Sequence, residues 1–496
     1  MTDATVAARA ARPTQAARPA RAAGPSPAAG SARGGQEPGG HPHWAVLPVV
    51  LTAAFMTTLD FFIVNVAIPS LQRDLHAGAA AIQWVVAGFG LAVAAILITA
   101  SRLGDAFGRR RVFTVGLILF TITSAACGLA PTAGLLVAGR VLQGASAGLM
   151  TPQVLAILRT SYSGRAQARA FSMFGLSLGI GAVSGQLIGG LLIRADVLGL
   201  DWRTCFLINV PVGVAAVALT PRVVPESRGP ARTALGIPGM LIASLALVAI
   251  VLPLIQGRQS GWPAWTWPSL AGGCLLLAAF ARYQHRVAAR GGAPLIDPVL
   301  FRERAVAVGL LAQLVFWTGQ ASFFLVLAIY LQEGRGLTAL ASGVVFTSIG
   351  AGYLITSSTA HHLARRLGRQ VIAVGAVIMV AGLALLRAGA APGAGVGWLV
   401  PGLLVDGLGM GMVLAPLAVT VLARVTPQHA GSAAGVLSTV QQVGNALGVA
   451  LLGIVFYGAL GGGVPHAFRG CLIFLIVVEL ALAALVQMLP KNPAGA

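Results

Sequence analysis

The segment LDFFIVNVAIP (Leu59–Pro69) places one carboxylate, Asp60, inside an apolar run that extends from about residue 45 to residue 68. A helix of about 20 apolar residues is long enough to cross the hydrocarbon core of a bilayer. A charge at the centre of such a helix costs about 2.5–3.5 kcal/mol on insertion scales, so a partner or a function must offset it. The role of Asp60 therefore depends on whether the rest of the chain also belongs in a membrane.

The composition indicates that it does. Of the 496 residues, 57% are hydrophobic and 9% are charged, and the mean hydropathy is +0.85. Ordinary globular chains carry about 25% charged residues. We therefore predict an all-α membrane protein with 14 transmembrane helices. The predicted spans are 45–68, 83–101, 112–130, 134–158, 168–193, 204–221, 237–255, 268–283, 305–330, 340–360, 370–388, 397–422, 432–457 and 470–489.

The distribution of basic residues predicts the orientation of the chain. If the N-terminus is cytoplasmic, most of the 33 Lys and Arg residues fall in the N-terminal arm, the inner loops and the tail. This asymmetry is typical of the positive-inside rule and predicts a multi-pass protein of the plasma membrane with both termini in the cytoplasm. The net charge of +20 is then explained without nucleic-acid binding.

The N-terminal arm and the cysteines suggest no additional site. Residues 1–43 are rich in Ala, Pro, Gly and Arg, so we expect a disordered cytoplasmic arm. The first apolar run is too long and starts too late for a cleavable signal. The four cysteines are isolated, which favours small apolar core residues. We predict no metal and no cofactor.

An internal similarity predicts how the spans are grouped. RVLQGASAGLMTPQVLAILR, from Arg140, aligns with VDGLGMGMVLAPLAVTVLAR, from Val405, so that Gly144 falls on Gly409. This match pairs the fourth span with the twelfth, which indicates a duplicated unit of six spans. We therefore predict four parts, namely the arm at 1–43, a six-helix bundle at 44–222, an inserted two-helix hairpin at 237–283 and a second six-helix bundle at 305–490.

The loop after the second span, SRLGDAFGRRRVF, has an unusual charge pattern. Gly104 and Gly108 permit the tight reversal that a short loop between two spans requires. Asp105 is an acid beside the cations Arg109 and Arg110, at a site where it can meet a helix N-terminus or an arginine. The alternative is a surface ion pair worth less than about 1 kcal/mol.

These segments resemble signatures of a known family. GDAFGRRR is similar to the inner-loop signature of the major facilitator superfamily. LDFFIVNVAIP, RVLQGASAG and WRTCFLINVPVG resemble the span-1, span-4 and span-6 signatures of its fourteen-helix drug:proton antiporter branch. The resemblance covers about residues 44 to 490. It implies a transporter in which the loop around Asp105 holds the two halves together on the inner side in one state.

The fifth span contains a candidate packing signature that departs from the family pattern. GLSLGIGAVSGQLIGG resembles the antiporter signature, and its small residues allow helices to pack closely. Gln186 stands where the family has a proline, which leaves the direction of transport open. The candidate packing residues are Gly181, Gly185, Gln186, Gly189 and Gly190.

Three acids and Arg140 lie well inside the predicted spans, away from their ends. Asp60 and Arg140 lie at nearly equal depth, because their spans run in opposite directions at 1.5 Å per residue. They can form a structural ion pair, but we favour a functional pair, since intramembrane charges usually serve function. Asp406 lies at similar depth in the second half, and Glu479 is expected at a structural or lipid-edge position. The candidate polar residues of the cavity are Asn65, Gln143, Gln441 and Asn445, for which interhelical hydrogen bonding is the other role.

The function follows from what the sequence contains and lacks. It has no nucleotide-binding motif and no nucleophile–base or metal set, so we expect a gradient-driven transporter and not an enzyme. We predict a monomer that exports amphiphilic small molecules, such as drugs or antibiotics, in exchange for protons. The alternatives are proton-coupled uptake and export of an endogenous metabolite. A membrane sensor lacks support, because no soluble domain of any size is present.

Overall fold

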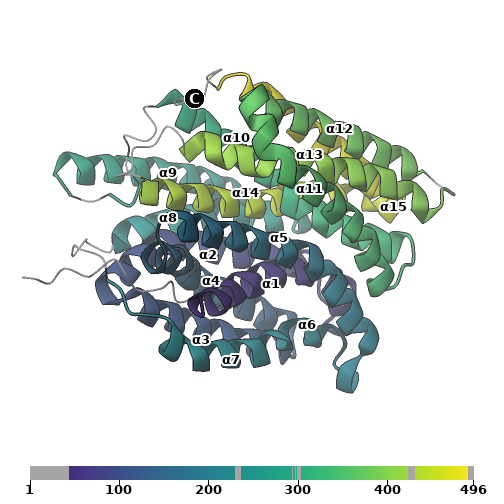
Figure 1. Ribbon diagram of the computed structural model, residues 1–496. Helices are drawn as coiled ribbons and strands as arrows, with labels where there is room; N and C mark the ends of the chain where they lie inside the picture. Colours follow the sequence, from purple (N-terminus) through teal and green to yellow (C-terminus); the bar gives the residue numbers. More distant parts are fainter. Residues whose placement is uncertain are drawn as a thin grey trace, which may run out of the picture. The chain divides into compact units, whose positions relative to one another are not determined.

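The structure is a computed structural model that describes residues 44–228, 236–292, 294–296, 298, 303–391, 393–422 and 430–489. The predicted arm at 1–43 lies outside these residues. The described chain contains helices and no strands (Figure 1). The α-helices are α1 (Val46–Asp74), α2 (Ala79–Phe107), α3 (Arg109–Gly128), α4 (Ala133–Ser161), α5 (Gly164–Ala195), α6 (Thr204–Leu207), α7 (Asn209–Val223), α8 (Ile237–Gln259), α9 (Thr266–Ala289), α10 (Arg304–Ile329), α11 (Ala339–Leu367), α12 (Gln370–Gly389), α13 (Leu399–Leu422), α14 (Ala430–Ala459) and α15 (Val464–Val486).

The helices account for most of the predicted spans. Among the described residues, 12 helical segments are long and apolar enough to cross a membrane, and 13 if the two bent parts of α5 count as one span. Each of the 14 predicted spans overlaps a helix, but α9, which contains 268–283, is not among those segments. The described chain is therefore a multi-span membrane protein, and the predicted count of 14 crossings stays a prediction.

Helix α5 is bent although it lacks the proline of the family signature. The parts ending at Ala182 and starting at Ser184 meet at 41°. The Ser184 hydroxyl donates a hydrogen bond of 2.6 Å to the carbonyl of Ile180. A serine that bonds back to the preceding turn bends a helix, and glycines beside it weaken resistance to bending. Helix α5 is therefore bent without a proline in it.

The first seven helices form one set of close contacts. Helix α4 packs on α2 and α3, α1 packs on α5, and α7 packs on α3. A Cβ atom at Gly144 or Gly148 would overlap the carbonyl oxygens of Phe89 and Val93 on α2. These two positions of α4 therefore require glycine.

Helices α10 to α15 repeat this pattern. Helix α13 packs on α11 and α12, α10 packs on α14, and α15 packs on α12. Gly407 and Gly411 on α13 contact the backbone of α11 as the two glycines of α4 contact α2. The predicted partnership of the fourth and twelfth spans therefore has a structural counterpart. Its register is wrong by two residues, because Gly144 corresponds to Gly407 and not to Gly409.

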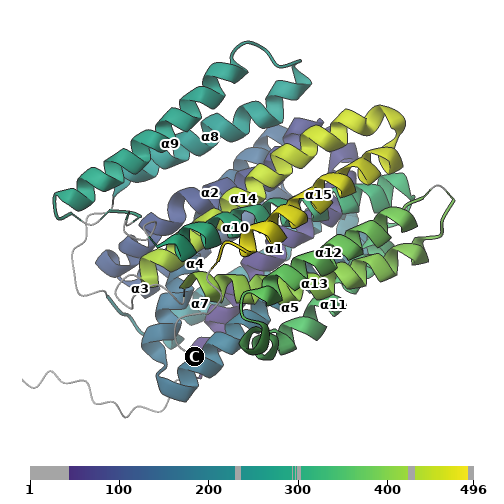
Figure 2. The ribbon, with the colours of Figure 1, turned by 90° about the horizontal axis from the view of Figure 1, so that it is seen from above.

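Two seams join the two sets of helices, namely α2 with α14 and α5 with α11. At the first seam a Cβ on Gly453 would overlap the Gln83 amide, and at the second a Cβ on Gly190 would overlap the backbone at Ala339. Helix α8 packs on α2 and α14, and α9 packs on α8 (Figure 2). We refer to the end of the bundles at the α1–α2 link as the Gly78 end, and to the opposite end, at the α2–α3 link, as the Gly108 end.

Candidate functional site

The structure brings Asp60 and Arg140 together. Arg140 Nη1 lies 2.5 Å from Asp60 Oδ2, and both side chains are fully buried. Asp60 comes from the middle of α1 and Arg140 from the first third of α4, at the matched depth that their positions predict. A buried carboxylate and guanidinium offset each other's cost of desolvation, and either alone would remain as an uncompensated charge.

Hydrogen bonds from two amides complete the shell of Asp60. Its Oδ1 accepts bonds of 2.9 Å from Gln143 Nε2 and from Asn209 Nδ2. The same two amide groups also donate to Ser124 Oγ at 3.0 Å, and Ser124 Oγ donates to the carbonyl of Phe206. Helices α1, α3, α4 and α7 therefore meet in one polar network inside an apolar bundle. This cluster, Asp60, Ser124, Arg140, Gln143 and Asn209, is called the ionic network below.

Arg140 does not hold the carboxylate with two parallel bonds. Its Nη1 also donates to Gln143 Oε1 at 2.8 Å, and its Nε donates to the carbonyl of Val85 on α2 at 3.0 Å. The guanidinium lies over the ring of Phe89, with Cζ 4.3 Å from the ring centroid. The donors of Arg140 therefore connect α1, α2 and α4, in addition to neutralising Asp60.

The other predicted cavity residues lie outside the ionic network. Asn65 Nδ2 donates to the carbonyl of Phe62, and Asn445 Nδ2 donates to Gln442 Oε1. Gln441 is partly buried on α14. Asp406 is buried on α13 and makes no ion pair in the described chain.

Glu479 was expected at a structural or lipid-edge position. Its side chain is buried inside the described chain, which excludes the lipid edge and leaves the structural role as a prediction. The carboxylate lies against Gly319 of α10, where the missing side chain leaves room for it.

The loop between α2 and α3 uses its glycines as expected. Gly104 leaves space for Gln153 of α4, whose Nε2 donates to the carbonyl of Ala100. Gly108 has φ of +108°, a region that favours glycine. Asp105 pairs with Arg109 one turn away, at 2.9 Å, and is partly exposed. In this conformation Asp105 therefore meets an arginine of its own loop.

A second acid, Glu226, occupies the N-terminus of α3, while Asp105, which was expected to meet a helix N-terminus or an arginine, meets Arg109. Its Oε1 accepts hydrogen bonds from the backbone N–H groups of Arg110 and Ser227, both at 3.1 Å. Its Oε2 lies 3.7 Å from Arg110 Nε and 3.8 Å from Arg111 Nε. An acid at the start of a helix is stabilised by the free N–H groups there. Glu226 therefore fixes the segment after α7 to the start of α3.

The glycine signature of α5 faces two helices. Gly181, Gly185 and Gly189 pack against α1, and Gly190 packs against α11. The backbone carbonyl of Gln186 faces Gly343 of α11, while its side-chain amide donates to the carbonyl of Phe62 at 3.0 Å. The signature therefore contributes both to the first bundle and to the seam with the second.

Contacts between the two sets of helices gather toward the Gly78 end. The rings of Phe62 and Phe324 lie 5.2 Å apart, and Gln332 Nε2 donates to the carbonyl of Val66 at 2.9 Å. The close approaches at Gly190 and Gly453 lie at the same end. The two sets are therefore packed together at the Gly78 end.

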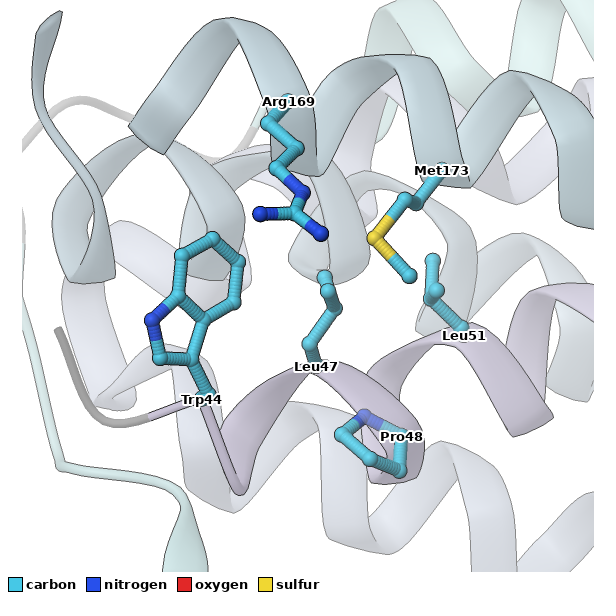
Figure 3. A pocket seen from close by; sticks show the side chains of 6 residues that line it. All are labelled: Trp44, Leu47, Pro48, Leu51, Arg169 and Met173. Atoms are coloured by element: carbon cyan, nitrogen blue, oxygen red, sulfur yellow. The ribbon is translucent and has the colours of Figure 1, made fainter. Parts of the chain in front are cut away.

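A cavity of about 410 Å³ lies at the Gly108 end, where α1 and α5 begin (Figure 3). The Arg169 guanidinium lies over the ring of Trp44 at 5.4 Å, and Trp44 contacts Tyr162 at the same centroid distance. Burial raises the pKa of the Tyr162 phenol, which therefore stays neutral at physiological pH. The cavity is lined by Trp44, Leu47, Pro48, Leu51, Arg169 and Met173. Its walls combine apolar side chains with one cation, Arg169.

The sequence relatives described below are a transporter and two resistance proteins. The family model of the Major Facilitator Superfamily matches residues 50–449. A probable actinorhodin transporter of Streptomyces coelicolor is 39% identical over 84% of this chain and 73% of that protein. The puromycin resistance protein of Streptomyces alboniger is 36% identical over 90% of this chain and 91% of that protein. The multidrug resistance protein Stp of Mycobacterium tuberculosis is 32% identical over 84% and 76%.

Solved structures share the fold at low sequence identity. An auto-inhibited peptide transporter of the POT family has a TM-score of 0.66 at 15% identity, covering 91% of this chain and 98% of that one. A bacterial homologue of the human lysosomal transporter Spinster, inward-facing and unoccupied, has a TM-score of 0.65 at 15% identity, covering 91% and 97%. At this identity the likeness concerns the arrangement of the helices only.

Proposed function

This chain belongs to the Major Facilitator Superfamily, and we propose that it exports antibiotics and other amphiphilic drugs in exchange for protons. Its relatives at 32–39% identity carry names of antibiotic transport and drug resistance. The observation that supports coupling most directly is the ionic network, which places one fully buried carboxylate beside one fully buried guanidinium.

Proton coupling requires a group that exchanges a proton as the transporter changes state. Asp60 keeps its charge while Arg140 and the two amides surround it. A rearrangement within the first bundle that moves α4 relative to α1 would break the 2.5 Å contact and leave the carboxylate without its cation. An unpaired carboxylate in a dry interior is neutralised by a proton instead. Proton uptake at Asp60 would then accompany one conformation and release would accompany the other.

The proposed architecture is two six-helix bundles with α8 and α9 as an insert. Helices α6 and α7 count as one span, so 14 helical spans cross the membrane. The repeated packing of α10–α15 on the pattern of α1–α7 supports the division into bundles. The basic residues support an orientation with both termini in the cytoplasm of a plasma-membrane protein. We also propose that the protein acts as a monomer, because a six-plus-six arrangement contains both faces of the transport path.

The orientation assigns a state to the conformation. With both termini inside, the Gly78 end is the outer end, and the close contacts there exclude the outside. The cavity beside Trp44 then lies at the inner end, where cargo enters an exporter. Asp105 pairs within its own loop in this conformation, so its proposed latch to the second half belongs to the opposite state.

Drug susceptibility in a host without its own efflux pumps tests this proposal. Cells expressing the chain and cells expressing the Asp60→Asn/Arg140→Gln variant at equal membrane levels are compared over a panel that includes puromycin. We expect resistance only with the unchanged chain, and its loss when an uncoupler abolishes the proton gradient. Equal susceptibility of cells with and without the chain to every compound would reject drug export, and resistance that survives the uncoupler would reject proton coupling.

A further inference from the structure

The repeated packing assigns each residue of the ionic network a counterpart in the second bundle. Gly185 on α5 contacts the carbonyl of Leu59 on α1, and Gly448 on α14 contacts the carbonyl of Thr318 on α10. Leu59 therefore corresponds to Thr318, and the next residue, Asp60, corresponds to Gly319. In the same way Gly144 corresponds to Gly407, so Gln143 corresponds to Asp406.

The place of the missing Asp60 carboxylate is taken by an acid from another helix. A Cβ atom on Gly319 would lie 3.3 Å from Glu479 Oε1. Helix α15, which carries Glu479, packs on α10 and α12, as α7 packs on α1 and α3. The second bundle therefore holds a carboxyl group at the position that corresponds to Asp60 of the ionic network. This group comes from α15, whereas Asp60 comes from the counterpart of α10.

The two acids of the second bundle occupy the counterpart positions of Gln143 and Asp60, which are hydrogen-bonded at 2.9 Å in the first bundle. Asp406 is 2% exposed and Glu479 is 1% exposed. Asp406 Oδ1 and Glu479 Oε2 are buried and have no hydrogen-bond partner in the described chain. None of the five ion pairs in the described chain includes either acid. No arginine there takes the place that Arg140 has in the first bundle, since its counterpart by the same register is Leu403.

Two buried carboxylates without a cation cannot both be ionised. An isolated ionised carboxylate is so costly in a dry interior that it takes up a proton, and a neighbouring like charge increases that tendency. We propose that Asp406 and Glu479 form a second proton-binding site, which holds at least one proton in this conformation. The proton passes from water to a carboxylate oxygen and back when the second bundle opens, and no other bond changes. Only the link of this site to transport rests on the proposed function.

Infrared spectroscopy tests the site without any cargo. The purified chain in lipid nanodiscs is titrated from mildly acidic to mildly alkaline pH, and the carbonyl stretch of protonated carboxylic acids is recorded. The variants are Asp406→Asn, Glu479→Gln and the two together, with Glu303→Gln as a matched control. Glu303 is an exposed acid at the start of α10 and lies outside the site.

We expect a buried carboxylic-acid band in the unchanged chain and in the control, and its complete loss in the double variant. Each single variant should keep one acid band with a changed titration midpoint, because the two groups titrate as one system. A spectrum unchanged in the double variant would overturn the proposal. Unchanged midpoints in both single variants would also overturn it, since they would show two independent acids.

The same preparations separate the site from the transport function. Ethidium, an organic cation, is added as a probe at fixed pH. Ethidium binding that is lost in the double variant, together with no acid band at any pH in the unchanged chain, would identify a cation site and overturn the proton assignment. If no variant or parent exports any drug, the proposed function fails while the infrared titration still decides the site. If the parent exports drugs but shows no acid band, the second site fails while the proposed function stands.

Discussion

The two bundles share one helical frame but manage buried charge in opposite ways. In the first, one carboxylate is neutralised by Arg140 and satisfied by two amides. In the second, Asp406 and Glu479 are buried and make no ion pair in the described chain. The close-approach glycines are conserved between the halves of the chain, since Gly144 and Gly148 have counterparts in α13.

This difference indicates what each bundle can do electrically. An ion pair stays charged until a motion separates its partners, so the first bundle responds to geometry. Two acids without a cation change charge only by taking up or releasing protons, so the second responds to pH. The shared glycine contacts set the helix positions in both bundles, and the residues between them set the chemistry.

The largest expected effect is on the free energy of unfolding, and it tests whether the buried acids of the two bundles differ in having a cationic partner. Asp60→Asn leaves Arg140 as a lone buried charge and should lower the free energy of unfolding by about 3–5 kcal/mol. Asp406→Asn removes an acid that has no cation and should be neutral or stabilising. The measurement is the midpoint of thermal unfolding of both variants in detergent. Equal destabilisation by the two would show that Asp406 also has a cationic partner.

The double variant Asp60→Asn/Arg140→Gln separates folding from coupling. It removes both charges of the pair, so the free energy of unfolding should return to near that of the parent. Gradient-driven drug flux in reconstituted vesicles should nevertheless stay absent, because no acid remains at that site. Full flux from this variant would show that Asp60 only holds helices together and has no role in proton coupling.

The next effect concerns the geometry of the cation. Arg140→Lys keeps the charge but loses the Nε bond to the carbonyl of Val85 and the planar contact with Phe89. The loss of a hydrogen bond to a charged group costs about 1.5–3 kcal/mol. We expect most transport activity to disappear while the protein remains in the membrane. Parental flux from the lysine variant would show that charge balance alone matters.

A smaller effect is expected at the seam between the bundles. A Cβ atom at Gly190 would lie 2.6 Å from the carbonyl oxygen of Ala339, so Gly190→Ala should disfavour the closed Gly78 end by about 1–3 kcal/mol. Gly175→Ala on the same helix is the control, because nothing lies within 4 Å of its added Cβ. Labelling of an Ala339→Cys reporter by an impermeant maleimide should increase in the first variant only.

The smallest effect on stability is expected at the loop acids. Asp105→Asn removes a partly exposed pair worth less than about 1 kcal/mol, so the unfolding midpoint should hardly change. Drug export should nevertheless be crippled, because the acid is needed for the proposed latch in the opposite state. Glu226→Gln provides the contrast: it weakens a helix cap and two arginine contacts, and should lower the midpoint more than Asp105→Asn does.

The sequence predicted those features that depend on local pattern or on depth. Apolar length located the helices, and opposite running directions predicted the meeting of Asp60 with Arg140. Gln143, predicted as a cavity residue or as an interhelical hydrogen-bonding residue, lies in the network, and its role in the cavity stays a prediction. Asn209 and Ser124 were not predicted, although each is a polar residue in an otherwise apolar span. Which polar residues meet depends on helix rotation, which composition does not specify.

Three features required the three-dimensional contacts. Glu226 reaches the start of α3 from a segment more than 100 residues later, so no local pattern indicates it. The repeat was placed two residues out of register, since matching letters aligned Gly144 with Gly409 while the packed face uses Gly407. Glu479 was expected at a structural or lipid-edge position, and the choice between the two depends on which face of α15 packs inward, which the contacts with α10 and α12 show.

The position of α8 has a consequence for how a hydrophobic compound reaches the interior. This helix packs on α2 and α14 and so covers one of the two seams from the side, while the insert makes no comparable contact with α5 or α11. A molecule dissolved in the lipid therefore finds the α2–α14 seam covered by α8, while neither α8 nor α9 covers the α5–α11 seam. We expect lateral entry from the bilayer to be one-sided. Cargo would then enter only at the α5–α11 seam, which the bent helix α5 lines.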